Sequence, residues 1–473
     1  FFLYFLLHFF FSFCKFKPNK KQFKQRQMSS DTLNSSHPGD VAFILLSTAL
    51  IQLMIPGLGY FYSGMSLDKN ALSLMLISIV SMAIVLIQWF VIGYSLSFST
   101  TSGPFLGNGQ FAFLMGVQGD TTVISSLPNI AYCILQAMFA AITPALVVGS
   151  IAERFNMIPM GVFMLIWTTL VYDPIAYWTW GKNGWLLQLG ALDFAGGTPV
   201  HMASGYAGLA LALYCGKRRP SSEPTKPHSM SSVILGTALL WFGWNGFNGA
   251  SAGAANVRAA MAIVTTNLAA SMAGLTWLVI DYVRDRRVSA LGFCSGVVSG
   301  LVTITPGSGY VSPASSLAFG FLGGIVCNYA SRIKHQLGFD DTLDVFGIHG
   351  VGGTLGNFLT GIFAESWVMA LDGTVKPGGA LSGHGIQIVY QLVSIGAAIA
   401  WAFFVTLAIV FCMEKIGLKL RASEEREDLG ADHAQIGEYT FDYVGDRISE
   451  SIDIKRNATL AQLPNLTPPV TTS

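Results

Sequence analysis

Long, uninterrupted apolar segments are the feature that most limits what this chain can fold into. Stretches of roughly 20 mainly apolar residues recur along it, and a helix of that length crosses the hydrocarbon core of a bilayer. Charged residues make up only 11% of the chain, whereas a soluble domain carries about 25%. The strands of a membrane barrel alternate apolar and polar residues, and these segments do not. The sequence therefore predicts an all-α integral membrane protein.

The loops between these segments indicate an orientation. Eleven basic residues fall on one set of alternate loops, and only three fall on the other set from residue 99 onward. Lysine and arginine are enriched on cytoplasmic loops, so we expect the C-terminus in the cytoplasm and the N-terminus outside. We predict eleven transmembrane helices, at 41–64, 71–98, 129–151, 157–180, 197–215, 231–251, 257–281, 288–305, 313–332, 343–364 and 386–413.

Eleven spans divide into two sets of five and one extra helix. Because five is an odd number, the second set must enter the membrane in the opposite direction to the first. Segments rich in glycine and aromatic residues lie in the first span of each set, at 56–64 and 241–251. Inverted repeats of this kind place a substrate pathway at their interface, near the middle of the membrane.

The two ends of the chain lie outside the predicted transport domain of residues 41–413. Residues 1–27 begin with Phe and carry six basic residues, so we interpret them as an upstream or targeting-like segment that is not native. We expect residues 28–40 to be extracellular. Residues 414–473 carry mixed charge and end in a Pro- and Thr-rich stretch, which indicates a cytoplasmic tail.

Two histidines, His201 and His349, lie inside apolar segments. An ionisable residue at bilayer depth is costly, which makes each one a candidate functional residue. A single histidine in a helix is more often structural, but these two occupy the fifth span of each half and favour a shared pathway. Each follows an aspartate by eight residues, Asp193 and Asp341, although Asp344 is a competing candidate in the second half.

Four motifs occur in order along the chain, at 139–154, 193–201, 245–251 and 343–350. Together they resemble the ammonium transporter family (Amt/Mep/Rh), and within it the fungal-type ammonium permeases, over residues 38 to 440. The resemblance implies a plasma-membrane homotrimer with one pore per subunit. It implies ammonium or ammonia as substrate, with methylammonium as an analogue, and neither enzymatic activity nor a cofactor or metal. Nothing in the net charge of +1 indicates a nucleic-acid partner.

The resemblance assigns roles to residues at the outer end of the pore. Trp180 matches the aromatic residue that recruits the cation, and Ser251 matches the hydroxyl that accepts a hydrogen bond from ammonium. Phe139 and Phe247 match the stacked pair that closes the pore. By position alone, Trp180 is more often an anchor at the membrane interface and the phenylalanines are more often core residues.

Further roles follow for the polar residues inside the membrane. His201 and His349 match the family's twin histidines, which form a polar track in an apolar tube. A histidine rather than an acid at the first position is associated with the high-affinity, sensor-like subtype. Asp193 matches an aspartate needed for transport, and we expect it to cap the start of span five. In the second half, Asp344 looks a better match for this capping role than Asp341.

Three alternatives to simple transport remain open from the sequence. The protein could be an ammonium sensor in which signalling is primary, or a sodium-coupled carrier. An intramembrane metal-dependent enzyme could use His201, His349 and Asp193, but a zinc site would need a further close ligand.

Modification sites are expected on both sides of the membrane. Ser423 and Ser449 lie in the tail in patterns that a regulatory kinase could recognise. A phosphate there would add about −1.5 to −2 charge. Of the three glycosylation sequons, only that of Asn34 lies on the predicted outer side.

Overall fold

The computed structural model describes residues 37–118, 123–124, 127–219 and 226–445. Within these ranges the fold is helical, and the only β-structure is an isolated bridge between Phe155 and Arg421. This confirms the predicted all-α class. The predicted upstream segment 1–27 and the modification candidates Asn34 and Ser449 lie outside the described residues.

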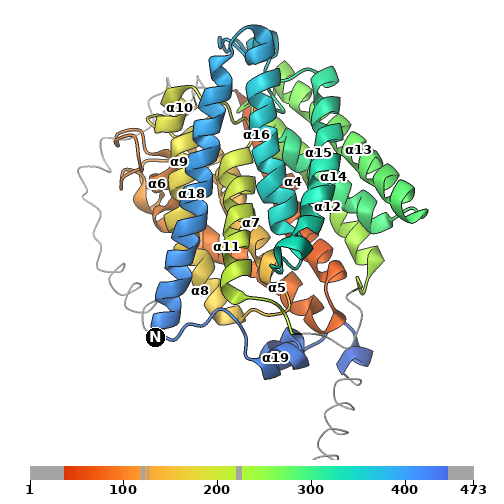
Figure 1. Ribbon diagram of the computed structural model, residues 1–473. Helices are drawn as coiled ribbons and strands as arrows, with labels where there is room; N and C mark the ends of the chain where they lie inside the picture. Colours follow the sequence, from red (N-terminus) through yellow and green to blue (C-terminus); the bar gives the residue numbers. More distant parts are fainter. Residues whose placement is uncertain (1–36, 119–122, 125–126, 220–225, 446–473) are drawn as a thin grey trace, which may run out of the picture.

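Each of the eleven ranges predicted as spans contains a helix (Figure 1). Wide π-helical turns interrupt two of these spans, at η2 and η5, and open two others, at η6 and η7. In chain order the segments are α4 (Pro38–Met65), α5 (Ala71–Gln88) with η2 (Trp89–Gly93) and α6 (Tyr94–Phe98), α7 (Asn129–Val148), α8 (Met157–Trp167) with η5 (Thr168–Tyr172) and α9 (Asp173–Trp180), η6 (Gly197–Met202) with α11 (Ala203–Cys215), α12 (Met230–Ala250), α13 (Val257–Asp285), α14 (Ala290–Ile304), α15 (Pro313–Leu337), η7 (Phe346–Gly350) with α16 (Val351–Phe363), and α18 (Ile386–Lys415).

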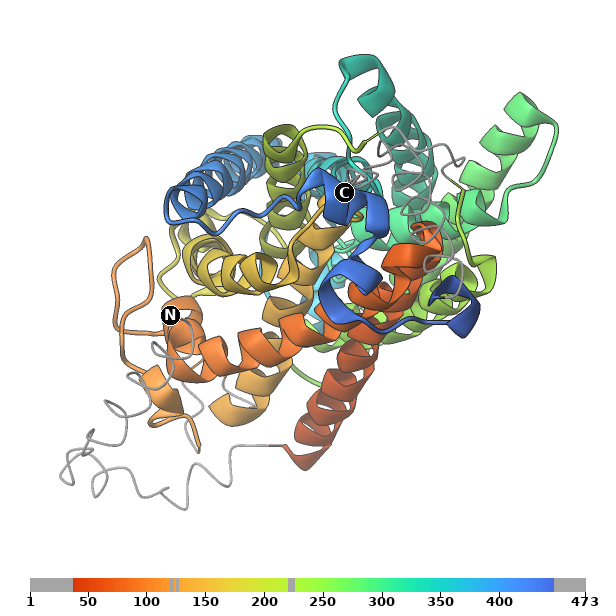
Figure 2. The same cartoon turned by 90° about the horizontal axis from the view of Figure 1, so that it is seen from below.

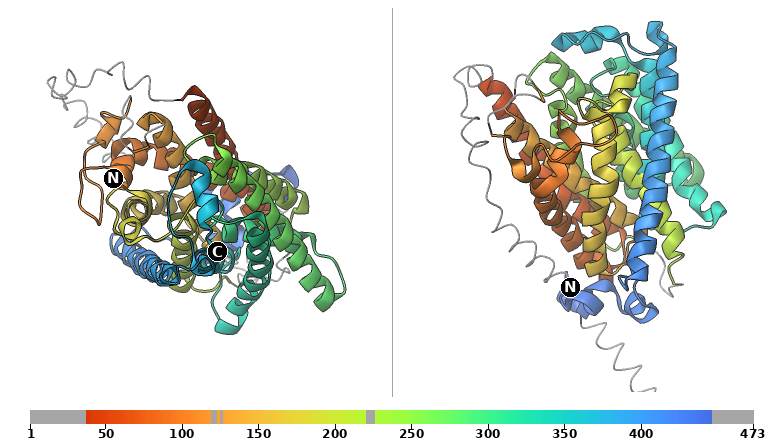
Figure 3. Two further views of the ribbon diagram at one scale, coloured as in Figure 1. Left: turned by 90° about the horizontal axis from the view of Figure 1, so that it is seen from above. Right: turned by 90° about the vertical axis from the view of Figure 1, so that its left-hand side faces the viewer.

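Short helices cover the two ends of this bundle. Among them are α10 (Trp185–Leu189) and α17 (Ser366–Met369) at one end, and α19 (Glu424–Leu429) in the tail at the other (Figure 1). Figure 3 shows α18 running along most of the height of the bundle.

Six segments of the described chain are long and apolar enough to cross a membrane, judged by length and composition. They are Pro38–Met65, Asp68–Phe98, Asn129–Ile151, Met157–Leu189, Val257–Asp285 and Ile386–Lys415. The remaining predicted spans are shorter or less apolar, and the number of eleven membrane crossings stays a prediction.

The first and sixth spans run antiparallel, as expected for an inverted repeat. The end of α4 meets the start of α12, because the Ser229 amide donates to the Gly64 carbonyl at 3.2 Å. At the other end of the pair, a Cβ on Gly246 would lie 2.9 Å from the Ser47 carbonyl oxygen. The two helices are therefore side by side along their length.

The fifth and tenth spans form a second antiparallel pair at the centre of the bundle. A Cβ on Gly205 would overlap the backbone nitrogen of Gly350, so only hydrogen can occupy that position without movement. Further along the pair, a Cβ on Gly353 would lie 3.0 Å from the Gly197 carbonyl oxygen. Small residues let membrane helices approach closely in this way.

A network of charged residues closes the end of the bundle that carries the tail. Arg218 pairs with both Glu153 and Asp340, each at 2.9 Å, and the fully buried Arg154 donates to Thr342 at 2.6 Å. Burial raises the pKa of Asp340, but the hydrogen bonds and charge of Arg218 outweigh burial and hold the pKa below its usual value. The loops after spans three, five and nine are thereby tied together.

The described part of the tail lies across this end of the bundle (Figure 2). The Ala422 amide donates to the Arg154 carbonyl at 2.9 Å, and Asp432 accepts from the Leu72 and Ser73 amides at 2.9 and 2.8 Å. Asp432 thus caps the start of α5 with a side chain from the tail. Ser423, a predicted phosphorylation site, is exposed and is the N-cap residue of α19.

We predict that replacing Gly205 with Ala lowers the melting temperature of the purified protein by several degrees. Forcing atoms into a filled interior typically costs about 1–3 kcal/mol, and here the added methyl group meets backbone. The matched control is Gly396→Ala in α18, where a Cβ would meet nothing within 4 Å. If both variants melt at the same temperature as the parent protein, the two spans are not in close contact.

We also predict that Asp432→Ala releases the tail from the loops. The variant loses two hydrogen bonds to a charged acceptor, each worth about 1.5–3 kcal/mol. Limited proteolysis should then cut the tail faster by tenfold or more. Asp442→Ala changes an exposed acid in the same segment and should leave the cleavage rate unchanged. Equal cleavage of both variants would contradict the docking.

Candidate functional site

A file of aromatic rings leads from one end of the bundle to its centre. Trp180 ends α9, and its ring lies edge-to-face on Phe139 of α7, with centroids 6.0 Å apart. Phe139 stacks on Phe247 of α12 at 3.9 Å, with the ring planes 23° apart. Both phenylalanine side chains are fully buried. Three helices distant in sequence therefore converge on one line of rings.

The two histidines lie directly beyond these rings. His201 is in η6 and His349 in η7, and their Nδ1 atoms are 3.2 Å apart. Since Nδ1 faces Nδ1, one ring must donate and the other accept if both are neutral. His201 also stacks on Trp244, with centroids 5.3 Å apart. The Nε2 atom of His201 is buried and has no hydrogen-bond partner in the described part of the chain.

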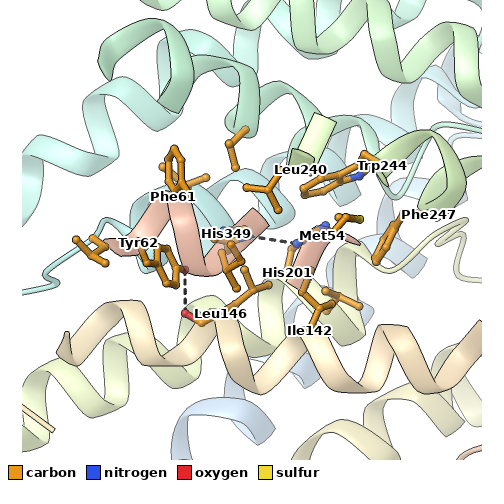
Figure 4. A pocket seen from close by; sticks show the side chains of 15 residues that line it. Met54, Phe61, Tyr62, Ile142, Leu146, His201, Leu240, Trp244, Phe247 and His349 are labelled. Carbon is orange, nitrogen blue, oxygen red and sulfur yellow. Dashed lines mark hydrogen bonds between the residues drawn. The ribbon is translucent and has the colours of Figure 1, made fainter. Parts of the chain in front are cut away.

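A narrow cavity surrounds the histidines (Figure 4). Its walls come from six spans and are mostly aliphatic and aromatic. The lining residues are Met54, Leu58, Phe61, Tyr62, Ile142, Leu146, Val200, His201, Leu240, Trp244, Phe247, Val298, Leu343, Ile348 and His349. The Tyr62 hydroxyl donates to the Leu146 carbonyl at 3.0 Å, which leaves the imidazoles as the main polar groups of this space.

Asp193 caps the wide turn that carries His201. Its carboxylate accepts hydrogen bonds from the amides of Gly196, Gly197 and Thr198 at 2.8, 2.9 and 2.6 Å. The carbonyl of Asp193 also accepts from the Trp180 indole at 3.1 Å. Asp193 therefore connects the start of span five with the end of span four, and the expected capping geometry is present.

In the second half, Asp341 performs the same task, and the match we favoured for Asp344 is wrong. Asp341 accepts from the Val345 and Phe346 amides at 3.1 and 2.8 Å, at the start of the turn that holds His349. Asp344 lies at φ +60° and pairs instead with Lys334 at 2.6 Å. The eight-residue spacing from aspartate to histidine thus reflects one local structure built twice.

Ser251 is less closely joined to this arrangement than the other candidates. Its hydroxyl donates to the Phe247 carbonyl at 2.9 Å, within the last turn of its own helix. This bond leaves the oxygen with acceptor capacity, which is the property the resemblance requires of it. The structure records no bond between Ser251 and either Trp180 or Asp193.

Two cavity residues did not stand out in the sequence. Trp244 supplies the face on which His201 stacks, and its indole donates to Thr305 at 2.9 Å. Its position three residues before Phe247 puts both rings on one helix face, and this spacing was the available signal. Tyr62 was visible only as part of the glycine- and aromatic-rich segment 56–64.

Within the described ranges, no group of three or more His, Cys, Asp or Glu side chains is placed to hold a metal ion. His201 and His349 have each other as partners, whereas Asp193 is engaged by backbone amides.

Comparisons with known proteins agree with the motifs. The model of the Ammonium Transporter Family matches residues 42–441. Ammonium transporter 1 of Schizosaccharomyces pombe is 49% identical over 410 residues, covering 86% of this chain and 82% of the relative. Ammonium transporter MEP2 of Saccharomyces cerevisiae is 46% identical and covers 90% of this chain and 87% of its own.

Solved structures show the same likeness in three dimensions. The crystal structure of Candida albicans Mep2 superposes with a TM-score of 0.80 at 45% identity, covering 86% of this chain and 91% of that one. The structure of Saccharomyces cerevisiae Mep2 gives a TM-score of 0.79 at 44% identity, covering 84% and 92%. The chain is therefore a multi-pass membrane protein and belongs to the ammonium transporter family.

Proposed function

We propose that this protein recruits ammonium at Trp180 and Ser251, removes a proton near Asp193, and conducts ammonia past Phe139 and Phe247. The observation that carries the proposal is the continuous file of rings that ends at two paired imidazoles in an apolar cavity.

Electrostatics is the reason for the proton transfer. Moving an ion from water into a low-dielectric interior carries an idealised cost of order 20 kcal/mol before relaxation. Ammonium can avoid most of this cost by leaving its proton behind, whereas an alkali cation of similar size cannot. The rings of Phe139 and Phe247 are in contact, which supports a barrier to hydrated ions. Selectivity then comes from chemistry rather than from size.

To recruit ammonium, the outer end of the pathway must attract the cation before the cation loses its water. An indole face contributes about 0.5–1 kcal/mol at an exposed site and about 2 or more when it is desolvated. Trp180 is half-buried and held by its bond to Asp193, so its face is preorganised. We expect Asp193 to shape the field at this site mainly through its charge and its helix cap. We do not assign it direct proton transfer.

Passage through the centre relies on the imidazoles. A neutral histidine pair offers both donor and acceptor positions to ammonia in a space otherwise lined by apolar groups. The unpartnered Nε2 atom of His201 supports this role. Movement of the proton along the two rings, which would make transport electrogenic, forms part of the same proposal.

The assembly proposed here is a homotrimer in the plasma membrane with the tail in the cytoplasm. The predicted inside loops and the tail share one end of the bundle, which supports the assigned orientation. Phosphorylation of Ser423 by a kinase would place negative charge at the start of α19, beside the docked tail. Native mass spectrometry would test the trimer.

The deciding experiment is electrical recording on reconstituted protein under opposed ammonium and potassium gradients. The proposal expects currents that follow ammonium and ignore potassium, in the presence or absence of sodium. Transport of rubidium as readily as methylammonium would overturn it, and a requirement for sodium would favour the sodium-coupled carrier. A transport-dead variant that still signals would favour the sensor alternative.

We predict that replacing His201 and His349 together with Ala lowers the ammonium-specific current at least tenfold. The polar track is lost while the surrounding apolar packing remains. His335→Ala, at the exposed end of α15, is the control and should keep full current. Unchanged ammonium current in a folded double variant would remove the histidines from the mechanism.

We predict that Asp193→Asn raises the half-saturation concentration for methylammonium by tenfold or more, which corresponds to about 1.4 kcal/mol. The variant removes the negative charge next to Trp180 and weakens the cap. Asp341→Asn weakens the equivalent cap in the other half and should leave the half-saturation concentration unchanged. If both variants changed the half-saturation concentration equally, the role of Asp193 would be only that of a structural cap.

A further inference from the structure

One acid in the bundle has no part in the pathway described above. Asp173 is the first residue of α9, and its side chain is fully buried in the middle of span four. It does not line the cavity around the histidines. A carboxyl group at bilayer depth is costly and marks a candidate for function.

The partners of Asp173 are neutral. Its Oδ2 atom accepts a hydrogen bond from Gln88 Nε2 at 2.7 Å, and its Oδ1 atom accepts one from Ser97 Oγ at 3.3 Å. Among the ion pairs recorded in the described ranges, none includes Asp173. Both donors come from span two, so the acid joins span four to span two.

The junction lies where two wide helical turns meet. Gln88 directly precedes η2, and Asp173 directly follows η5. Gln88 Nε2 also donates to Thr169 inside η5 at 3.1 Å. A Cβ on Gly93 would overlap the Gln88 side-chain oxygen, so glycine at this position makes room for the amide. Wide turns are rare inside α-helices and occur frequently at functional sites.

The short helix that starts at Asp173 ends at Trp180. The two residues are seven positions apart, which is about two turns, so they project from nearly the same face. Near its outer end the helix is also held by loop contacts. The Tyr177 hydroxyl donates to the Gly103 carbonyl at 2.8 Å, and the Trp178 indole donates to the Phe105 carbonyl at 2.6 Å.

We propose that Asp173 is a positioning residue for Trp180. Its hydrogen bonds to Gln88 and Ser97 fix the base of α9, and the length of that helix sets where the indole meets Phe139 and the Asp193 carbonyl. The inference rests on the proposed function, in which Trp180 recruits the cation. Hydrogen bonding by the side chain is the property required, and its negative charge is not.

The test compares Asp173→Ala, Asp173→Asn and Gln88→Ala in liposomes by methylammonium uptake per folded protein. Asp173→Ala and Gln88→Ala should raise the half-saturation concentration three- to tenfold and leave the maximal rate within twofold. Asp173→Asn keeps hydrogen-bonding groups at both positions and should restore the parent value. If Asp173→Ala does not fold, the result for Gln88→Ala decides the test.

The matched control is Ser78→Ala on α5. Ser78 is buried on the same span, but its hydroxyl bonds to the Leu74 carbonyl of its own helix, so its loss should change neither kinetic constant. An unchanged half-saturation concentration in both Asp173→Ala and Gln88→Ala would overturn the inference. So would an Asp173→Asn variant as impaired as Asp173→Ala, because that result would make the charge the essential property.

A readout independent of transport separates this inference from the proposed function. With 5-fluorotryptophan incorporated, the fluorine NMR signal of Trp180 can be assigned from its loss in Trp180→Leu. Asp173→Ala should shift that signal, whereas Asp173→Asn and Ser78→Ala should not. If Trp180→Leu leaves methylammonium uptake unchanged, the recruitment role fails, and the Trp180 signal alone decides whether Asp173 positions the indole.

Discussion

The contact between the imidazoles of His201 and His349 is the interaction on which the rest of the arrangement depends. A distance of 3.2 Å between two Nδ1 atoms requires the backbones of spans five and ten to approach closely. Gly205 and Gly350 permit this approach, because a side chain on Gly205 would overlap its neighbour's backbone. The helix starts must also be held in place, and Asp193 and Asp341 cap them from opposite halves. The contact between the two histidines therefore requires a particular backbone placement in spans five and ten.

Much of this could be predicted from the sequence, because hydropathy and spacing report local properties. The positions of the helices followed from apolar length, and the cap by Asp193 followed from an acid at the start of a span. Asp344 was wrongly favoured over Asp341, because both precede the same helix and the left-handed backbone of Asp344 cannot be read from residue type. The wide turns were missed because an extra residue in a turn shifts a helical repeat, and spans that are apolar on most faces show no clear repeat to shift. The contact of Trp244 with His201 could be recognised only in the structure, where the two rings stack.

Helix α5, the first part of span two, is fixed at both ends by carboxylates from elsewhere in the chain. Asp432 of the tail caps the start of α5, and Asp173 of span four binds Gln88 at its end. Such a helix cannot shift along its axis without losing hydrogen bonds at one end or the other. It packs against α7, which carries Phe139, through the bond from Ser81 to the Ala141 carbonyl. Phe139, the proposed gate residue, is thus supported by a helix whose own position is set from two sides.

The donors around Asp193 also bear on charge. Asp193 is satisfied by backbone amides, so these donors do not cancel its charge as a lysine or arginine would. In the pathway we propose, a fixed cation at the outer mouth would repel ammonium before it reached Trp180. Arg258 lies over the ring of Phe194, the residue next to Asp193, but its guanidinium is paired with Asp372 at 2.7 Å. Arg258 is thus paired while Asp193 has neutral donors, which supports the proposal that this end of the bundle favours a positive substrate.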